Sequence, residues 1–402
     1  MSIGGNTEIW EKKVRKTKIM DPTEEYDQLI RPVMISCHVF GCWSQQGPGG
    51  IISSKFHRTA ILLFALIAST STTAGAVVFW GLDMNETIEC ILVLSVLNLA
   101  LLRIIVFASK RKDMMLIVET MRNDWLDSSP FERSVLRNKC RLAFKLAKFF
   151  IISVAMTILM FALMPIIEVK LADGETGQSK LPFRGYYFFN HTTSPRYECT
   201  YFVNSVIGCF SSSTIAGGTS FCLIATIHAA AKFALVQRDF RTLDSSDWTA
   251  GGPKIEGVVR KHLECIRFAE KVESVINFLA LAQFITSTGL MCFAGFQLTT
   301  MLEDKTRLLK YAAFLQAAIL ELFLFSYSGH RLKTESENVA DVTYLSNWIG
   351  TSSPTNFKMV SMRSSKPCTI TAGKFYDMSL ESFLKVMGSS FSYLTVLLAI
   401  KD

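Results

Sequence analysis

Long apolar runs alternate with short polar segments along the whole chain. A helix that crosses a membrane needs about 20 mostly apolar residues, and seven runs reach that length. These runs cover residues 58–80, 87–109, 143–167, 200–230, 273–301, 308–329 and 379–400. The polar segments between them are too short to fold as a separate domain. The pattern therefore predicts an all-α membrane protein with seven transmembrane helices and no soluble domain.

Composition supports a membrane location, and the charges orient the chain. Half of the residues are hydrophobic and only 19% are charged, against about 25% in ordinary soluble proteins. Thirty of the 42 Lys and Arg residues fall in residues 1–58, 110–142, 231–272 and 330–376. Cytoplasmic loops carry the excess of positive charge, so the N-terminus is predicted inside and the C-terminus outside. The net charge of +8 comes without a basic patch interleaved with aromatic residues, which argues against nucleic-acid binding.

The first 57 residues differ from the rest because they are polar and basic. They contain no short apolar core of the kind found in a secretory signal peptide, so we expect the first apolar run to act as the insertion signal. Within this segment, residues 24–44 predict a short amphipathic helix at the membrane interface. Two parts are thus expected: a cytoplasmic segment over residues 1–57 and a seven-helix domain over residues 58–402.

Two N-glycosylation sequons agree with this orientation. Asn85-Glu86-Thr87 and Asn190-His191-Thr192 both fall in segments that the charge distribution places outside. Both asparagines are therefore predicted glycosylation sites. Cys90 and Cys199 also lie near the predicted outer face and could pair.

Signals for catalysis and metal binding are absent from the sequence. The chain has no GxSxG, P-loop or GxGxxG motif, its ten Cys include no CxxC pair, and its six His show no ligand spacing. No enzyme activity, metal or cofactor is expected. The orientation is the reverse of a G-protein-coupled receptor, and no internal repeat favours a transporter.

The last apolar run carries a polar stripe. Lys385, Ser389, Ser392, Val396 and Ala399 share one helix face, at steps of three and four residues. A polar stripe that narrows to an apolar constriction suits a pore with a hydrophobic gate. Packing between helices also enriches small residues such as Ser and Gly, so both interpretations stay open at this point.

The stretch from Ser326 to the C-terminus resembles the C-terminal signature of insect odorant receptors. The matching segments are Gly329 with Leu332, Glu335-Ser336, Tyr344 with Trp348, Lys366-Pro367, Thr371-Ala372-Gly373-Lys374-Phe375 and Ser392-Tyr393-Leu394-Thr395. The N-terminal Leu29-Ile30-Arg31-Pro32 and the seven-helix architecture extend the likeness over the rest of the chain.

The resemblance implies an odorant-gated, non-selective cation channel in the plasma membrane of olfactory sensory neuron dendrites. In this family an odour-tuned subunit forms a heterotetramer with a common co-receptor, and each subunit gives its last helix to one pore. The co-receptor has a long insertion in the inner loop that corresponds to residues 231–272, which are short here. The chain is therefore similar to a tuning subunit. The alternatives are a gustatory-type chemoreceptor channel, disfavoured by residues 371–375, and a multi-span transporter.

Site residues follow from the resemblance and from helix phase. Val396 corresponds to the family's hydrophobic gate, and the predicted pore-lining residues beside it are Ser389, Ser392, Ala399 and Ile400. The predicted odorant-binding residues are Leu92, Ser95, Met156, Met160, Met164, Val206, Phe210, Ser211, Tyr311 and Phe314. Aromatic and Met side chains suit a small volatile, apolar ligand, although such stripes also serve packing.

Two charged residues fall inside the apolar runs. Arg103 is expected to act as a snorkelling anchor at the inner end of the second run. Glu321 lies deep in the sixth run and needs a partner or a neutral state. Structural and gating roles for Glu321 both stay open.

Overall fold

The computed structural model describes residues 21–39, 48–82, 84–171, 181–183, 185–187, 189–190, 192–243, 252–300, 305–348 and 354–401. Its helices are α2 (Pro22–Val39), α3 (Pro48–Phe79), α4 (Met84–Ser109), α5 (Arg111–Asp127), α6 (Pro130–Leu171), α7 (Arg196–Arg241), α8 (Pro253–Thr300), α9 (Lys305–Tyr344), α10 (Pro354–Ser364) and α11 (Leu380–Lys401). Two short antiparallel strands, β1 (Thr371–Ala372) and β2 (Tyr376–Asp377), precede α11.

Local sequence explains where several helices begin. Proline opens α2, α3, α6, α8 and α10, because its missing N–H costs nothing in the first helical turn. Before α6, the backbone N–H of Ser129 donates to Glu132, and the Ser129 hydroxyl accepts from the Glu132 N–H in return. This reciprocal capping box separates α6 from α5.

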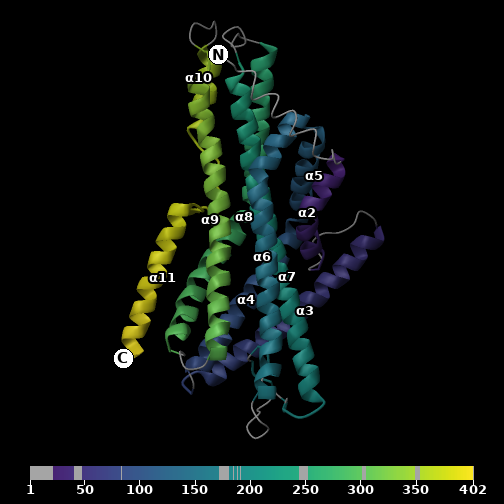
Figure 1. The fold of residues 1–402 in the computed structure, drawn as a ribbon, viewed down its shortest axis with the longest axis vertical. Coiled ribbons are helices and arrows are strands. Elements are labelled where there is room, and N and C mark those ends of the chain that lie inside the picture. The colour runs from purple at the N-terminus through teal and green to yellow at the C-terminus, as the bar shows by residue number, and fades with distance from the viewer. Residues whose placement is uncertain are drawn as a thin grey trace.

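The long helices extend well beyond a membrane. α7, α8 and α9 contain 46, 48 and 40 residues, which at 1.5 Å per residue gives about 60–70 Å, against a hydrocarbon core of about 30 Å. Residues 231–272 and 330–376, expected as polar connections, therefore largely continue these helices toward α10 (Figure 1). Residues 110–142 likewise form α5 and the first turns of α6.

The seven predicted spans correspond to α3, α4, α6, α7, α8, α9 and α11. Among the described residues, α4, α6, α7, α8 and α9 are long and apolar enough to cross a membrane, and α3 has a shorter apolar part over Ala65–Phe79. α7 is the central helix and contacts α2, α3, α4, α5, α6, α8 and α9. Small residues allow this close packing, since a Cβ on Gly218 would lie 3.0 Å from the Phe107 ring.

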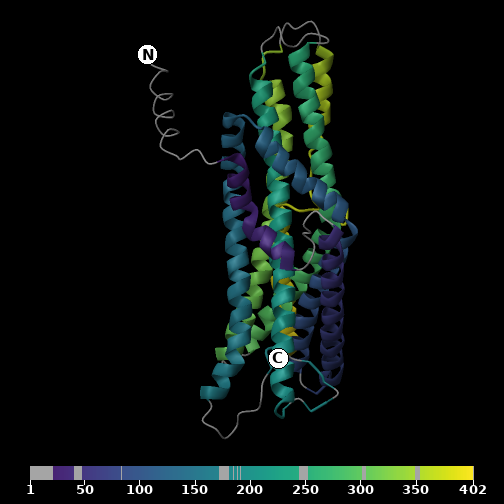
Figure 2. The same ribbon diagram turned by 90° about the vertical axis from the view of Figure 1, so that its right-hand side faces the viewer.

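Helix α2 covers the extended half of the bundle. Figure 2 shows it lying diagonally beside α6 and α7. Tyr26, Ile30 and Val33 are buried there, and Glu25 pairs with Arg137 of α6 at 2.6 Å. The apolar face of the predicted interfacial segment thus packs on protein, while residues 40–44 of that segment lie outside the described residues.

A tight hairpin turns the chain into α11. Gly373 and Lys374 adopt positive φ angles of 60° and 69°, and the Gly373 N–H donates to the Asn277 carbonyl of α8. Glu273 of α8 accepts from the Thr371 hydroxyl at 2.6 Å and pairs with Lys374. The hairpin is therefore anchored on α8, and α11 descends along α8 and α9 (Figure 1).

Candidate ligand cavity and pore helix

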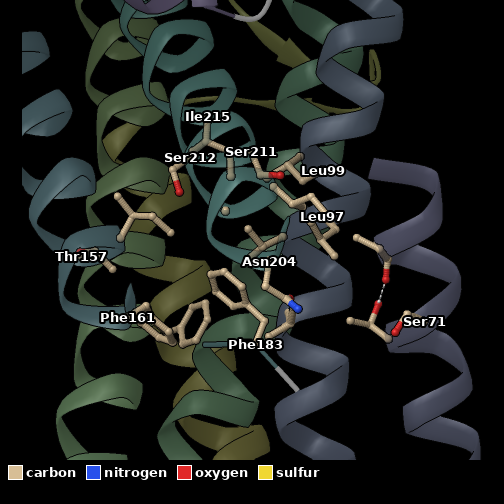
Figure 3. Close-up of a pocket in the computed structure, with 18 of the residues that line it drawn as sticks. Ser71, Leu97, Leu99, Thr157, Phe161, Phe183, Asn204, Ser211, Ser212 and Ile215 are labelled. Carbon is tan, nitrogen blue, oxygen red and sulfur yellow. Dashed lines mark hydrogen bonds between the residues drawn. The ribbon is translucent and has the colours of Figure 1, made fainter. Parts of the chain in front are cut away.

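A cavity of about 520 Å³ lies inside the bundle, at the end remote from α10. Helices α3, α4, α6, α7 and α9 line it together with Leu290 of α8, and this partly open cavity is mostly apolar (Figure 3). Cavities of about 300–1,000 Å³ are typical of small-molecule sites. The space is therefore sufficient for a compact organic molecule.

Three phenylalanines form one end of the cavity. The ring of Phe161 on α6 stacks on Phe183 with centroids 5.7 Å apart, and it meets the edge of Phe314 on α9 at 5.0 Å. Such ring pairs give a large contact area at fixed geometry. This end suits the apolar body of a ligand.

The segment between α6 and α7 contributes lining residues that the sequence analysis did not identify. These lining residues are Phe183, Tyr186, Tyr187 and Phe189. The Tyr186 N–H donates to the Ser71 carbonyl of α3 at 3.0 Å, and the Ser71 hydroxyl donates to the Tyr186 carbonyl at 2.9 Å. Asn204 of α7 donates to the Tyr187 hydroxyl at 2.7 Å. The only signal for this role was the aromatic content of a stretch expected to be a loop.

A buried polar network lies at the other end. Arg103 of α4 is 1% exposed, and its Nη2 lies 2.6 Å from Glu321 Oε1 on α9 and 2.6 Å from Gln283 Oε1 on α8. Its Nη1 donates to the Thr219 hydroxyl and the Ile215 carbonyl of α7, both at 2.8 Å. The snorkelling expectation for Arg103 is wrong, because this side chain points into the bundle toward a carboxylate.

The network borders the cavity directly. Glu321 and Ile215 line the cavity. Glu321 Oε1 also accepts from Thr219 at 2.5 Å, and its Oε2 accepts from Gln283 at 2.8 Å. Four helices are thereby linked by charge and hydrogen bonds beneath the ligand space, and the partner that Glu321 required is Arg103.

The structure brings two of the ten predicted odorant-binding residues to this cavity, Ser211 and Phe314. Leu92 and Tyr311 are buried elsewhere, Met156 is 60% exposed on the bundle surface, and Ser95 donates to its own helix. Met160, Met164 and Val206 do not line the cavity, and Phe210 lines a separate small void.

Helix phase explains the difference on α6 and α7. The row that faces the cavity on α6 contains Thr157 and Phe161, each one position after a predicted Met. On α7 it contains Ile207 and Gly208, which follow Val206. Consecutive side chains on a helix point about 100° apart, so an error of one position turns a predicted residue away from the cavity. An apolar run that contacts lipid on one side and protein on the other carries no sequence signal that shows which face is which.

The predicted pore face of α11 is exposed in the single chain. Ser389, Ser392 and Ala399 are exposed, and Val396 is 56% exposed. The side chain of Ile400 lies outside the described residues. The opposite face packs on α8, where a Cβ on Gly295 would lie 3.1 Å from Leu394.

The remaining sequence expectations concern the two glycosylation sequons, the cysteine pair and metal binding. Asn190 is exposed, and its side chain accepts from Thr192. Asn85 is half-buried in the first turn of α4. Cys90 is buried and Cys199 is exposed, and no disulfide joins them. Within the described part of the chain, no group of three or more His, Cys, Asp or Glu side chains could hold a metal ion.

The chain is thus a multi-helix membrane protein with a mostly apolar cavity between its helices, large enough for a small molecule. The family described as 7tm Odorant receptor matches residues 83–391, and the chain belongs to this family. It is 26% identical to Odorant receptor 82a of Drosophila melanogaster over 79% of the chain and 86% of that protein. It is 25% identical to Odorant receptor 13a of the same species over 72% of the chain and 74% of that protein.

Solved structures show the same fold. The insect olfactory receptor OR5 from Machilis hrabei, in complex with eugenol, superposes with a TM-score of 0.78 at 16% identity, covering 94% of this chain and all of that one. The protein without eugenol gives 0.77. The predicted seven-helix membrane fold, the resemblance to odour-tuned insect receptors and the multi-pass plasma-membrane location are confirmed. Members of the family are ligand-gated cation channels and not enzymes.

Proposed function

We propose that this chain is the odour-binding subunit of a heterotetrameric, non-selective cation channel that it forms with a co-receptor subunit. A small volatile compound binds in the cavity between α3, α4, α6, α7 and α9. The last helix, α11, contributes its exposed face to the shared pore. Na⁺, K⁺ and Ca²⁺ pass when this pore opens.

The cavity is the observation that carries the proposal. It is mostly apolar and is bordered by helices α8 and α9, which also pack against α11. A ligand opens the channel only if it binds the open arrangement more tightly than the closed one. Helices α8 and α9 therefore connect a ligand in the cavity physically to the pore helix α11.

The exposed stripe on α11 supports the pore assignment. The Ser392 hydroxyl donates to the Gly388 carbonyl, whereas the exposed Ser389 hydroxyl makes no hydrogen bond within the described residues. Lipid is a poor environment for such a group, and a water-filled pore suits it. Val396 lies on the same face and supplies an apolar constriction that gates by dewetting. Four copies of such a face around an axis would bury the stripe.

The test fills the cavity and measures current. A Cβ on Gly208 would lie 2.6 Å from the Phe183 ring and 2.7 Å from Ile158, so Gly208→Leu must displace these two cavity-lining side chains and change the ligand space. Gly257→Leu on α8 is the matched control, because nothing lies within 4 Å of its Cβ position. Both variants are expressed with and without a co-receptor and screened against a volatile panel.

The expected result is an odour-evoked cation current in the wild-type and Gly257→Leu channels that requires the co-receptor. Gly208→Leu should reach the cell surface and lose at least ten-fold in odorant sensitivity. Unchanged odour responses in Gly208→Leu would reject the cavity as the ligand site. A surface-expressed wild-type protein with no current in any pairing would reject the channel assignment.

A further inference from the structure

Most hydroxyl groups around the cavity are already hydrogen-bonded. Thr70, Thr72, Thr157 and Thr200 donate to carbonyls of the preceding turn, at 2.8–3.1 Å. The Ser71 hydroxyl donates to the Tyr186 carbonyl. A ligand would have to break one of these bonds to use such a group.

Ser211 and Ser212 are different. Both line the cavity, and within the described residues neither hydroxyl makes a hydrogen bond, unlike Thr214 one turn further along α7, which donates to the Phe210 carbonyl at 2.9 Å. Ser211 is only 7% exposed. Buried polar groups are normally paired, because leaving one unpaired is costly. The two hydroxyls belong to consecutive residues and point to different sides of α7 (Figure 3). Because both residues line the cavity, each hydroxyl is available to a partner that the ligand supplies.

We propose that Ser211 and Ser212 form a hydrogen-bonding subsite, and that the cavity selects neutral volatiles carrying one carbonyl or hydroxyl oxygen on an apolar body. This inference rests on the proposed odorant function of the cavity. Carbonyl and hydroxyl oxygens both accept hydrogen bonds, so either group is able to receive a hydrogen from Ser211 or from Ser212.

The shape of the cavity fixes the orientation of such a ligand. Figure 3 shows Ser211 and Ser212 at the end with Leu99 and Ile215, whereas Phe161 and Phe183 lie at the opposite end. The oxygen would lie at the serine end and the apolar body among the phenylalanine rings. Ligands with oxygen at both ends would place one of them against aromatic carbon.

The charged network explains why the ligand is neutral. Glu321 also borders the cavity, but Arg103, Thr219 and Gln283 already donate to its two oxygens. The Arg103 guanidinium balances the carboxylate charge at 2.6 Å. An ammonium or carboxylate group would enter an apolar space with no free counter-charge in the described lining, and burying it there is strongly unfavourable.

The test compares compounds that differ only in the oxygen. Suitable pairs are acetophenone with α-methylstyrene, benzyl alcohol with ethylbenzene, 2-heptanone with 2-methyl-1-heptene, and 1-hexanol with heptane. Dose–response currents are recorded from cells expressing the chain with a co-receptor. Stabilisation of the purified chain against thermal unfolding by the same compounds gives a readout independent of gating.

The double variant Ser211→Ala/Ser212→Ala removes both hydroxyls with little change in volume. Ser205→Ala is the matched control on the same helix, since its hydroxyl donates to the Tyr201 carbonyl and it does not line the cavity. Loss of the neutral hydrogen bond to the ligand oxygen predicts a loss of up to about ten-fold in sensitivity to the oxygenated members. Sensitivity to the hydrocarbons should stay the same or improve.

Each outcome decides the inference. A preference for the oxygenated member in wild type and Ser205→Ala that disappears in the double variant establishes the subsite. Four results would overturn it. These are equal potency within the pairs, a preference that survives the double variant, selective activation by amines or acids, and no effect of any pair in either assay. Pair-dependent stabilisation without any current would support the subsite and reject the channel function instead.

Discussion

The buried pair of Arg103 and Glu321 is the most consequential side-chain contact in the membrane region. Each charge is nearly inaccessible to water, with side-chain exposures of 1% and 7%. Removing one partner of such a pair leaves an uncompensated buried charge, which typically costs about 3–5 kcal/mol. Removing both is far less damaging.

We therefore expect Arg103→Met to reduce surface expression and thermal stability strongly. Glu321→Gln should do the same to a smaller degree, because Gln retains hydrogen bonds with Gln283 or Thr219 but leaves Arg103 unpaired. The double variant should recover part of the loss. Melting of the purified single and double variants measures the coupling, and additive losses would mean that the pair contributes nothing specific.

His262 provides a pH-sensitive contribution outside the membrane. It lies 38 residues before the end of α8 at Thr300, or about 57 Å along the helix, beyond the reach of a bilayer core. Burial, together with the nearby charge of Arg363, lowers the pKa of His262 from 6.5 to about 4. The ring is thus neutral at pH 7, edge-on to Phe233 and Phe240.

The sign of the pH dependence follows from this lowered pKa. The folded chain binds the proton less tightly than the unfolded chain, so the stabilisation is complete above pH 6.5 and is lost between pH 6.5 and about 4. At pH 5 the loss is about 2 kcal/mol. His262→Leu should therefore lose less thermal stability than wild type between pH 7 and pH 5, and parallel curves for the two proteins would contradict the assignment.

Single side chains also show what sequence patterns could not provide. Glu321 was recognised as needing a partner, but its partner lies 218 positions away in the sequence, and no local spacing connects them. Ser211 and Phe314 line the cavity, whereas Met156, Met160 and Val206 each lie one position before a residue that does. The spacing of polar residues shows which face of a helix is buried only when the opposite face contacts water. Here the opposite face contacts lipid, so both faces are apolar.

Among the helices, apolar length was the reliable signal. Each predicted span coincides with part of a helix, because twenty apolar residues have few alternatives in a membrane. The helical extensions beyond the bilayer were not predicted, because their sequences are polar and hydropathy identifies only the apolar part of a helix. Capping signals were nevertheless readable there: Ser129 with Glu132 before α6, and the prolines that open α8 and α10.

Helix α11 allows the pore assignment to be tested separately from ligand binding. Val396→Ser should raise the basal leak current, because a hydroxyl at the constriction favours water and lowers the barrier to opening. Leu384→Ser is a suitable control, since Leu384 is also exposed on α11 but lies three turns away. Whole-cell recording without odorant gives the answer, and equal basal currents in the three proteins would remove Val396 from the gate.

The whole molecule is asymmetric about the membrane. α7, α8 and α9 continue past the apolar runs on the side of α10, and the basic segments 231–272 and 330–376 belong to these continuations. The cavity lies toward the opposite end. The charge distribution predicts that the basic side lies in the cytoplasm. In that orientation a ligand arriving from outside would meet the cavity first, and the long helical extensions would face the cell interior.

Glycosylation tests this orientation. Asn190 is exposed in the segment between α6 and α7, so we expect it to carry a glycan, whereas Asn85 is half-buried within α4 and should not. Asn190→Gln should abolish the glycosidase-sensitive mobility shift on a gel, and Asn85→Gln should leave it unchanged. An epitope tag at the N-terminus should be hidden from antibody in intact cells, and a tag at the C-terminus should be accessible. The reverse labelling pattern would invert the topology and place the cavity toward the cytoplasm, which would exclude direct capture of odorants from outside the cell.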